Sequence, residues 1–164
     1  MKIEYKGADQ YLIMLSKMQG RTKSVAGKAI YAAANIVADA IKANLKALPA
    51  VSERHNILAY KTGGKSKLSE KQKQGLLDGF GISKMEYQNG YYNVKTGFDG
   101  YNDISTNSYP KGQPNPMIAR CVENGSSYMD ATPFVKPAVN KSRKAAIAEM
   151  QRVIDEEYEK MMKG

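Results

Sequence analysis

The segment from Asn115 to Ala138 constrains the fold most, because signals that start and stop helices follow one another closely within it. Asn115 can cap a helix, and Pro116 suits the first helical position, where no amide donor is needed. Gly125 can end that helix in a left-handed conformation. A short helix is therefore predicted over Met117–Asn124.

A second start signal comes directly after this short helix. Thr132 can serve as the N-cap and Pro133 as the first residue of a helix whose apolar positions recur at helical spacing to the C-terminus. Pro137 is compatible with this helix because it lies in about the first turn, where a missing N–H group costs little. The short helix thus leads through a brief connection into a long one.

Two motifs in the same segment carry a family resemblance. The residues VENGSS begin at Val122, and the residues ATPFVKPA begin at Ala131 and open the long helix. In this combination the chain resembles the head-to-tail joining family of long-tailed bacteriophages, the gene-ten-like tail-completion or neck proteins. Weaker agreement in the order of elements extends over nearly the whole chain. The motif residues assigned by this resemblance are Val122, Glu123, Gly125, Pro133, Phe134 and Pro137.

The resemblance implies a structural virion protein that performs no chemistry and holds no cofactor. Such proteins are expected to form closed rings, commonly hexameric, around the channel through which the genome passes. The implied partners are further copies of the chain, the head connector or stopper, and the tail terminator or tail tube proteins. The implied location is the neck of the virion, after assembly in the host cytoplasm.

The positive charge is concentrated in the N-terminal half. The formal net charge is +9, and all of the excess lies in the first 75 residues. This distribution indicates an anionic partner, either nucleic acid, a membrane surface or an acidic protein face. A solvated surface that keeps the protein soluble explains it equally well. The chain lacks the apolar run of a membrane span and the pattern of a secretory signal, so we expect it to be made and kept in the cytosol. The family resemblance implies no membrane partner.

The N-terminal part is predicted to form one strand and two helices. Residues 2–6 alternate between charged and apolar side chains, which is typical of a short edge strand. Asp9 can cap a helix that Gly20 ends. Apolar positions at helical spacing then predict a long helix over Lys23–Leu48, which Pro49 stops.

A β-hairpin is predicted in the middle of the chain. Asn89-Gly90 indicates a two-residue turn between strands over 80–87 and 91–98. The cross-strand pairs that follow from this turn are Tyr87–Tyr92, Met85–Val94 and Gly81–Phe98. Phe80 and Ile82 then lie on the other face, so either both faces near the open end are covered or a bulge shifts the register.

Two long loops are predicted, at residues 50–75 and 99–116. The first has no usable periodicity and is rich in lysine, so it is expected to contact phosphate or to become ordered against a neighbouring subunit. Tyrosines on the second favour protein contacts, although packing on the same domain is the commoner role. Acidic residues near the C-terminus lie where the helix dipole favours cations, which indicates either fraying of the helix end or a contact with a basic neighbour. The candidate contacts with a subunit or with DNA are Lys61, Lys65, Lys67, Lys71, Lys73, Tyr101, Tyr109, Asp155, Glu156 and Glu157.

Residues with catalytic potential are sparse. The only histidine, His55, has no acidic or cysteine neighbour at ligand spacing, and the only cysteine, Cys121, is expected to be a small buried hydrophobe. GGKSK, from Gly63 to Lys67, lacks the spacing and the preceding strand of a phosphate loop. We therefore expect no enzyme, no metal and no cofactor. The alternative to a structural role is a basic DNA-binding accessory protein, whose affinity would fall steeply with salt.

These patterns together predict one domain over residues 1–164, with 42% hydrophobic residues and a modest core. The expected fold class is α+β. Two long helices pack on a small antiparallel sheet, which consists of the N-terminal strand and the hairpin. The short helix lies at the edge of the sheet, and Phe134 anchors the last helix against it.

Overall fold

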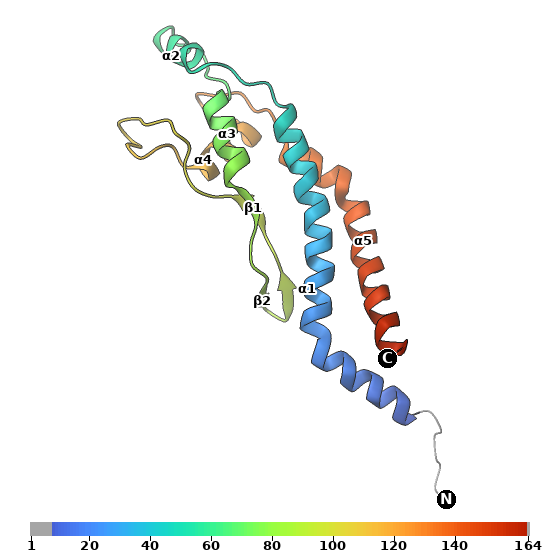
Figure 1. Ribbon diagram of the computed structural model, residues 1–164. Helices are drawn as coiled ribbons and strands as arrows, with labels where there is room; N and C mark the ends of the chain where they lie inside the picture. Colours follow the sequence, from blue (N-terminus) through green and yellow to red (C-terminus); the bar gives the residue numbers. More distant parts are fainter. Residues whose placement is uncertain (1–7, 164) are drawn as a thin grey trace, which may run out of the picture.

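The computed structural model describes residues 8–163, and residues 8–19 by their backbone alone. The fold class is α+β (Figure 1). The predicted strand at residues 2–6 lies outside the described residues. Within them, no helix combines the length and apolar character needed to cross a membrane. The elements in chain order are α1 (Ala8–Ala47), α2 (Glu53–Lys61), α3 (Glu70–Gly79), β1 (Phe80–Ile82), β2 (Glu86–Gln88), β3 (Tyr91–Asn93), β4 (Thr96–Phe98), α4 (Asn115–Asn124) and α5 (Val135–Lys163).

The long helices α1 and α5 pack against each other rather than together on one sheet (Figure 1). Their buried positions are mostly small residues, which let the two backbones approach closely; they include Ala29, Ala33, Ala38, Ala138, Ser142 and Ala146. At one end of the pair, Asn44 Nδ2 donates to the carbonyl oxygen of Phe134 at 3.0 Å. At the other end, Lys28 Nζ lies 2.7 Å from Glu157 Oε2. These two contacts fix the antiparallel alignment.

The predicted helix end at Gly20 is wrong, because α1 runs through this residue without interruption. A single glycine inside a helix costs only about 1 kcal/mol relative to alanine, and a long helix tolerates it. The predicted stop is confirmed to within one residue, since α1 ends at Ala47, shortly before Pro49.

The predicted loop at residues 50–75 is also wrong, because it contains α2 and α3. A capping box starts α3: Gln72 N–H donates to Ser69 Oγ at 3.3 Å, and Ser69 N–H donates to Gln72 Oε1 at 3.0 Å. Leu76 then anchors α3 in the core, where it is completely buried. The connection between the two helices is held by Asn56, whose side-chain amide bonds both backbone groups of Lys67.

The hairpin turn at Asn89-Gly90 is confirmed. Both residues have positive φ angles, 53° and 86°, as a primed two-residue turn requires. Tyr87 pairs with Tyr92 as predicted, and their ring centroids are 4.8 Å apart.

At the open end the predicted pairing of Gly81 with Phe98 is wrong by one residue, because Phe80 pairs with Phe98. A bulge explains the shift: residues 83–85 of the first strand lie opposite only residues 94–95 of the second. Ser83 closes the bulge, since its Oγ accepts a hydrogen bond from Lys95 N–H at 2.9 Å. The second of the two predicted arrangements is therefore the observed one, with β1–β4 and β2–β3 as separate two-stranded sheets.

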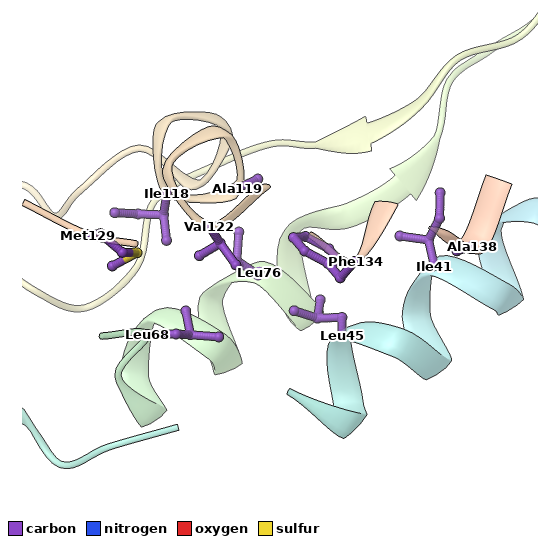
Figure 2. Close-up of a cluster of buried hydrophobic side chains, with 10 residues drawn as sticks. All are labelled: Ile41, Leu45, Leu68, Leu76, Ile118, Ala119, Val122, Met129, Phe134 and Ala138. Atoms are coloured by element: carbon purple, nitrogen blue, oxygen red, sulfur yellow. The ribbon is translucent and has the colours of Figure 1, made fainter. Parts of the chain in front are cut away.

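The core lies where α1, α3, α4 and the start of α5 meet (Figure 2). Phe134 is at its centre and is only 1% exposed. The Phe98 and Phe134 rings make a T-shaped contact with centroids 5.9 Å apart, so the hairpin is joined to this core. The other buried members of the cluster are Ile41, Leu45, Leu68, Leu76, Ile118, Ala119, Val122, Met129 and Ala138.

The second predicted loop is observed over residues 99–114, before α4 begins at Asn115. Its two ends are joined by Asn102, whose Oδ1 accepts from the N–H groups of Ile104 and Gln113. Asn115 was expected to cap α4 with its side chain. Instead Pro114 is at the cap position, and Asn115 Nδ2 donates to the carbonyl oxygens of Gly75 and Asp99 at 2.9 and 2.8 Å.

Candidate functional site

The two motifs of the C-terminal segment form one joint between α4 and α5. Glu123, near the end of α4, directs its carboxylate at the start of α5. Its Oε2 accepts from the N–H groups of Phe134 and Val135 at 2.7 and 2.8 Å, and its Oε1 accepts from Lys136 N–H at 2.8 Å. These are amides that a helix start leaves without intrahelical partners. A carboxylate from another helix therefore caps α5.

The predicted cap residue, Thr132, contributes differently. Its N–H donates to the carbonyl oxygen of Val122 at 2.7 Å, and α5 begins only at Val135. The prediction of an N-cap at Thr132 and a first helical residue at Pro133 is thus wrong. The carboxylate of Glu123 reaches the same amides from a second element and provides charge as well as acceptors.

The electrostatics of the joint favour the ionised form of Glu123. Desolvation by burial raises the pKa of Glu123, but the three backbone N–H donors and the charge of Lys136 together lower it by more. The pKa of Glu123 in the folded protein is therefore below its ordinary value. The capping interaction is at full strength at neutral pH.

Gly125 lets the chain reverse after α4. It has a φ angle of 77°, and its N–H donates to the carbonyl oxygen of Cys121 at 2.8 Å. A Cβ atom here would lie 3.1 Å from the backbone nitrogen of Ala131, so this position combines a left-handed conformation with close packing. Val122 is buried beside this turn, and Pro137 lies in the first turn of α5.

The predicted contact lysines do not gather in one place. Lys73 Nζ donates to the carbonyl oxygens of Lys46 and Leu48, both at 2.7 Å, and so caps the C-terminal end of α1. Lys65 pairs with Asp130. Of the others, Lys61 ends α2, and Lys67 and Lys71 are exposed on either side of Ser69.

Replacement of Lys73 by methionine tests its capping role. Lys73→Met keeps most of the aliphatic stem and removes the three donors, so the free energy of unfolding is expected to fall by about 1 to 2 kcal/mol. Urea denaturation would measure the change, with Lys71→Met as the exposed neighbouring control. An equal, small effect of both substitutions would show that the contact to α1 contributes no stability.

The acidic run at the end of α5 is paired within the chain. Glu157 lies 2.7 Å from Lys28 and 3.0 Å from Lys160, and hydrogen bonds from these lysines lower its pKa. Glu156 pairs with Arg152, and Asp155 accepts from Gln151 at 2.9 Å. This run lies at the opposite end of the molecule from α2 (Figure 1). The predicted lysines and acidic residues can therefore meet only between copies.

Exposed apolar and aromatic side chains occupy several projecting parts of the molecule. Tyr101 and Tyr109 are exposed on the loop at 99–114, and Tyr87 and Tyr91 are exposed beside the hairpin turn. Sequence reasoning missed a further surface on α2. The members of that surface are Ile57, Leu58 and Tyr60, which are 57%, 61% and 80% exposed.

Within the described part of the chain, the histidine and the cysteine lie apart from each other. His55 is exposed on α2, and Cys121 is half-buried against the core. Among the described residues, no three histidine, cysteine, aspartate or glutamate side chains are grouped closely enough to hold a metal ion. The exposed apolar surfaces are thus the strongest candidates for a function.

Comparison with known proteins finds no matching family, no similar curated protein and no similar solved structure. The function is therefore inferred from the motifs and surfaces of this chain.

Proposed function

We propose that the protein is a structural virion protein of a tailed bacteriophage. In this proposal it forms an oligomeric ring, commonly hexameric in the family it resembles, at the junction of head and tail. There it completes the tail or joins it to the head connector. Its partners are other copies of the chain and the adjoining head connector, stopper, tail terminator or tail tube proteins, and it needs no cofactor.

The first support is the motif segment. The residues VENGSS and ATPFVKPA carry the resemblance, and they also form one physical unit in the structure. Glu123 from the first motif caps the helix that the second motif opens, and Phe134 from the second motif fills the centre of the core. The two motifs therefore act as one structural unit, which sets the position of α5 relative to the rest of the domain.

The observation that carries the proposal is the exposed apolar surface of α2. This helix buries none of its residues, and no described part of the chain covers Ile57, Leu58 or Tyr60. A helix of this length gains little stability from its own hydrogen bonds and normally depends on packing. An outward apolar face on such a helix is suited to a protein contact, which an assembling virion protein requires.

The distribution of the lysines favours assembly over DNA binding. Lys73 and Lys65 are both engaged within the chain, so they do not form a continuous track for a phosphate backbone. Salt dependence distinguishes the two functions. A DNA-binding accessory protein would lose affinity for DNA steeply as salt rises, whereas a neck protein would show little DNA affinity to lose.

The decisive experiment is electron microscopy of phage particles produced without this protein. We expect separate filled heads and finished tails, because the joining component is missing. Purified wild-type protein added to the mixture should restore complete particles. Normal particles in the absence of the protein would contradict the proposed function.

A further inference from the structure

The outward face of α2 has a regular pattern. Arg54, Ile57, Leu58 and Lys61 follow the spacing of one helical face, and all four are exposed. The helix is oriented by Asn56, whose side chain bonds Lys67 on the inner side. The α2 face, defined by these four exposed residues, therefore has an apolar centre and a cation at each end.

A complementary groove lies between α1 and α5, near the end of α5. Val25 and Ala26 of α1 and Ile154, Tyr158 and Met161 of α5 line a groove with a volume of about 460 Å³. Asp155 also lines it. This α1/α5 groove is apolar at its centre and has one carboxylate, that of Asp155, at its margin, opposite in charge to the cations of the α2 face.

The two surfaces cannot meet within one chain. Figure 1 shows α2 beyond one end of the long helical pair, whereas the C-terminal end of α5 lies at the other. We propose that the α2 face of one copy docks into the α1/α5 groove of a second copy. This inference rests on the proposed function, since it names the surfaces through which the copies assemble. Leu58 and Ile57 enter the groove, and Lys61 lies against Asp155.

The contact uses different surfaces on the two partners, and this has a structural consequence. Each copy presents one α2 face and one groove. Every copy can therefore bind one neighbour through its α2 face and another through its groove, in a head-to-tail arrangement. Such a heterologous contact closes into a ring when the rotation between copies allows it. The opposite charges of Lys61 and Asp155 set the register of docking.

Directed disulfide formation tests the contact. In a Cys121→Ser background, one protein carries Ile57→Cys and a second carries Ile154→Cys. Under mild oxidation, the mixture is expected to give a linked dimer, whereas each protein alone gives none, because the contact brings residue 57 of one copy to residue 154 of the next. Non-reducing electrophoresis and mass spectrometry of the linked peptides measure this. A matched control pairs Ile57→Cys with Tyr128→Cys, a position that is 73% exposed but outside the contact.

Charge reversal tests the margin independently. Lys61→Glu and Asp155→Lys are each expected to lower the linked fraction about tenfold, the effect of a modest loss of binding energy. The two reversals placed on opposite partners should restore most of it, as a double-mutant cycle would reveal. Lys42→Glu, an equal charge change at an exposed position of α1 outside the groove, should have no effect.

The results that would contradict the docking surfaces differ from those that would contradict the neck function. Linkage of Ile57→Cys protein to itself would show a symmetric contact between α2 helices and would overturn the proposal, as would absence of linkage in the mixture. If wild-type protein joins heads to tails but residues 57 and 154 do not link, the proposed function stands and the docking surfaces are wrong. If the link forms but particles lacking the protein are normal, the docking surfaces stand and the neck function is wrong.

Discussion

Phe134→Ala is expected to lower the free energy of unfolding by about 3 to 5 kcal/mol. The Phe134 side chain is only 1% exposed and lies among residues of α1, α3 and α4 (Figure 2). The Phe98 ring makes a T-shaped contact with it. Alanine would remove these contacts and leave a cavity where four elements meet. The loss within this range depends on how far the surrounding side chains move into the cavity.

Urea denaturation followed by circular dichroism measures this change. Tyr128→Ala is the control, because that aromatic side chain is exposed, and a surface substitution changes stability by no more than about 0.5 kcal/mol. A loss below about 1 kcal/mol for Phe134→Ala would show that the core collapses around the smaller side chain. A fully stable variant that fails to join heads to tails would instead make Phe134 a contact residue of the assembly.

Local sequence signals correctly predicted the hairpin turn, the end of α4 and the end of α1. The turn at Asn89-Gly90 was predictable because both residues tolerate positive φ angles. The helix end at Gly125 has the same origin. The long helix before Pro49 was predictable from apolar spacing and from a residue that cannot continue a helix. In each case the determining interactions lie within a few residues of one another.

The region between α1 and β1 was misinterpreted for two different reasons. The capping box that begins at Ser69 was present in the sequence as S-x-x-Q and would have located α3. By contrast, α2 has its apolar spacing on the outward side, so a search for a buried stripe does not find it. The spacing of Ile57 and Leu58 was visible, but its meaning depends on a surface contact rather than on the core.

Tertiary contacts decided the positions that local signals misassigned. Asn115 is a good cap residue in isolation, but its amide group bonds the carbonyl oxygens of Gly75 and Asp99, which are distant in sequence. Thr132 was likewise a reasonable cap for the last helix, yet Glu123 occupies that role from α4. Neither of these two cap assignments could be corrected from the spacing of residues in the sequence, because each depends on how two helices approach in space. Among the candidate contact residues, the capping role of Lys73 was hidden for the same reason.

Glu123→Gln is expected to destabilise the protein at neutral pH by about 2 to 3 kcal/mol, within the range for hydrogen bonds to a charged group. The glutamine side chain has one acceptor oxygen and places an NH₂ group against amides that also donate. The N–H groups of Phe134, Val135 and Lys136 would then share too few acceptors. Glu86→Gln is the control, since Glu86 is an exposed hairpin residue whose partner Lys95 is 3.4 Å away.

The pH dependence separates the charge of Glu123 from its shape. Its folded-state pKa is lower than the ordinary value of 4.5, so the unfolded chain binds the proton more readily than the folded one. The stabilisation from Glu123 is therefore complete above the unfolded-state pKa and is lost as pH falls through the folded-state pKa. The difference in unfolding free energy between wild type and Glu123→Gln should shrink over that acidic range. A difference that stays constant from neutral pH down through the range would mean that packing of the side chain, and not its ionised carboxylate, holds the start of α5.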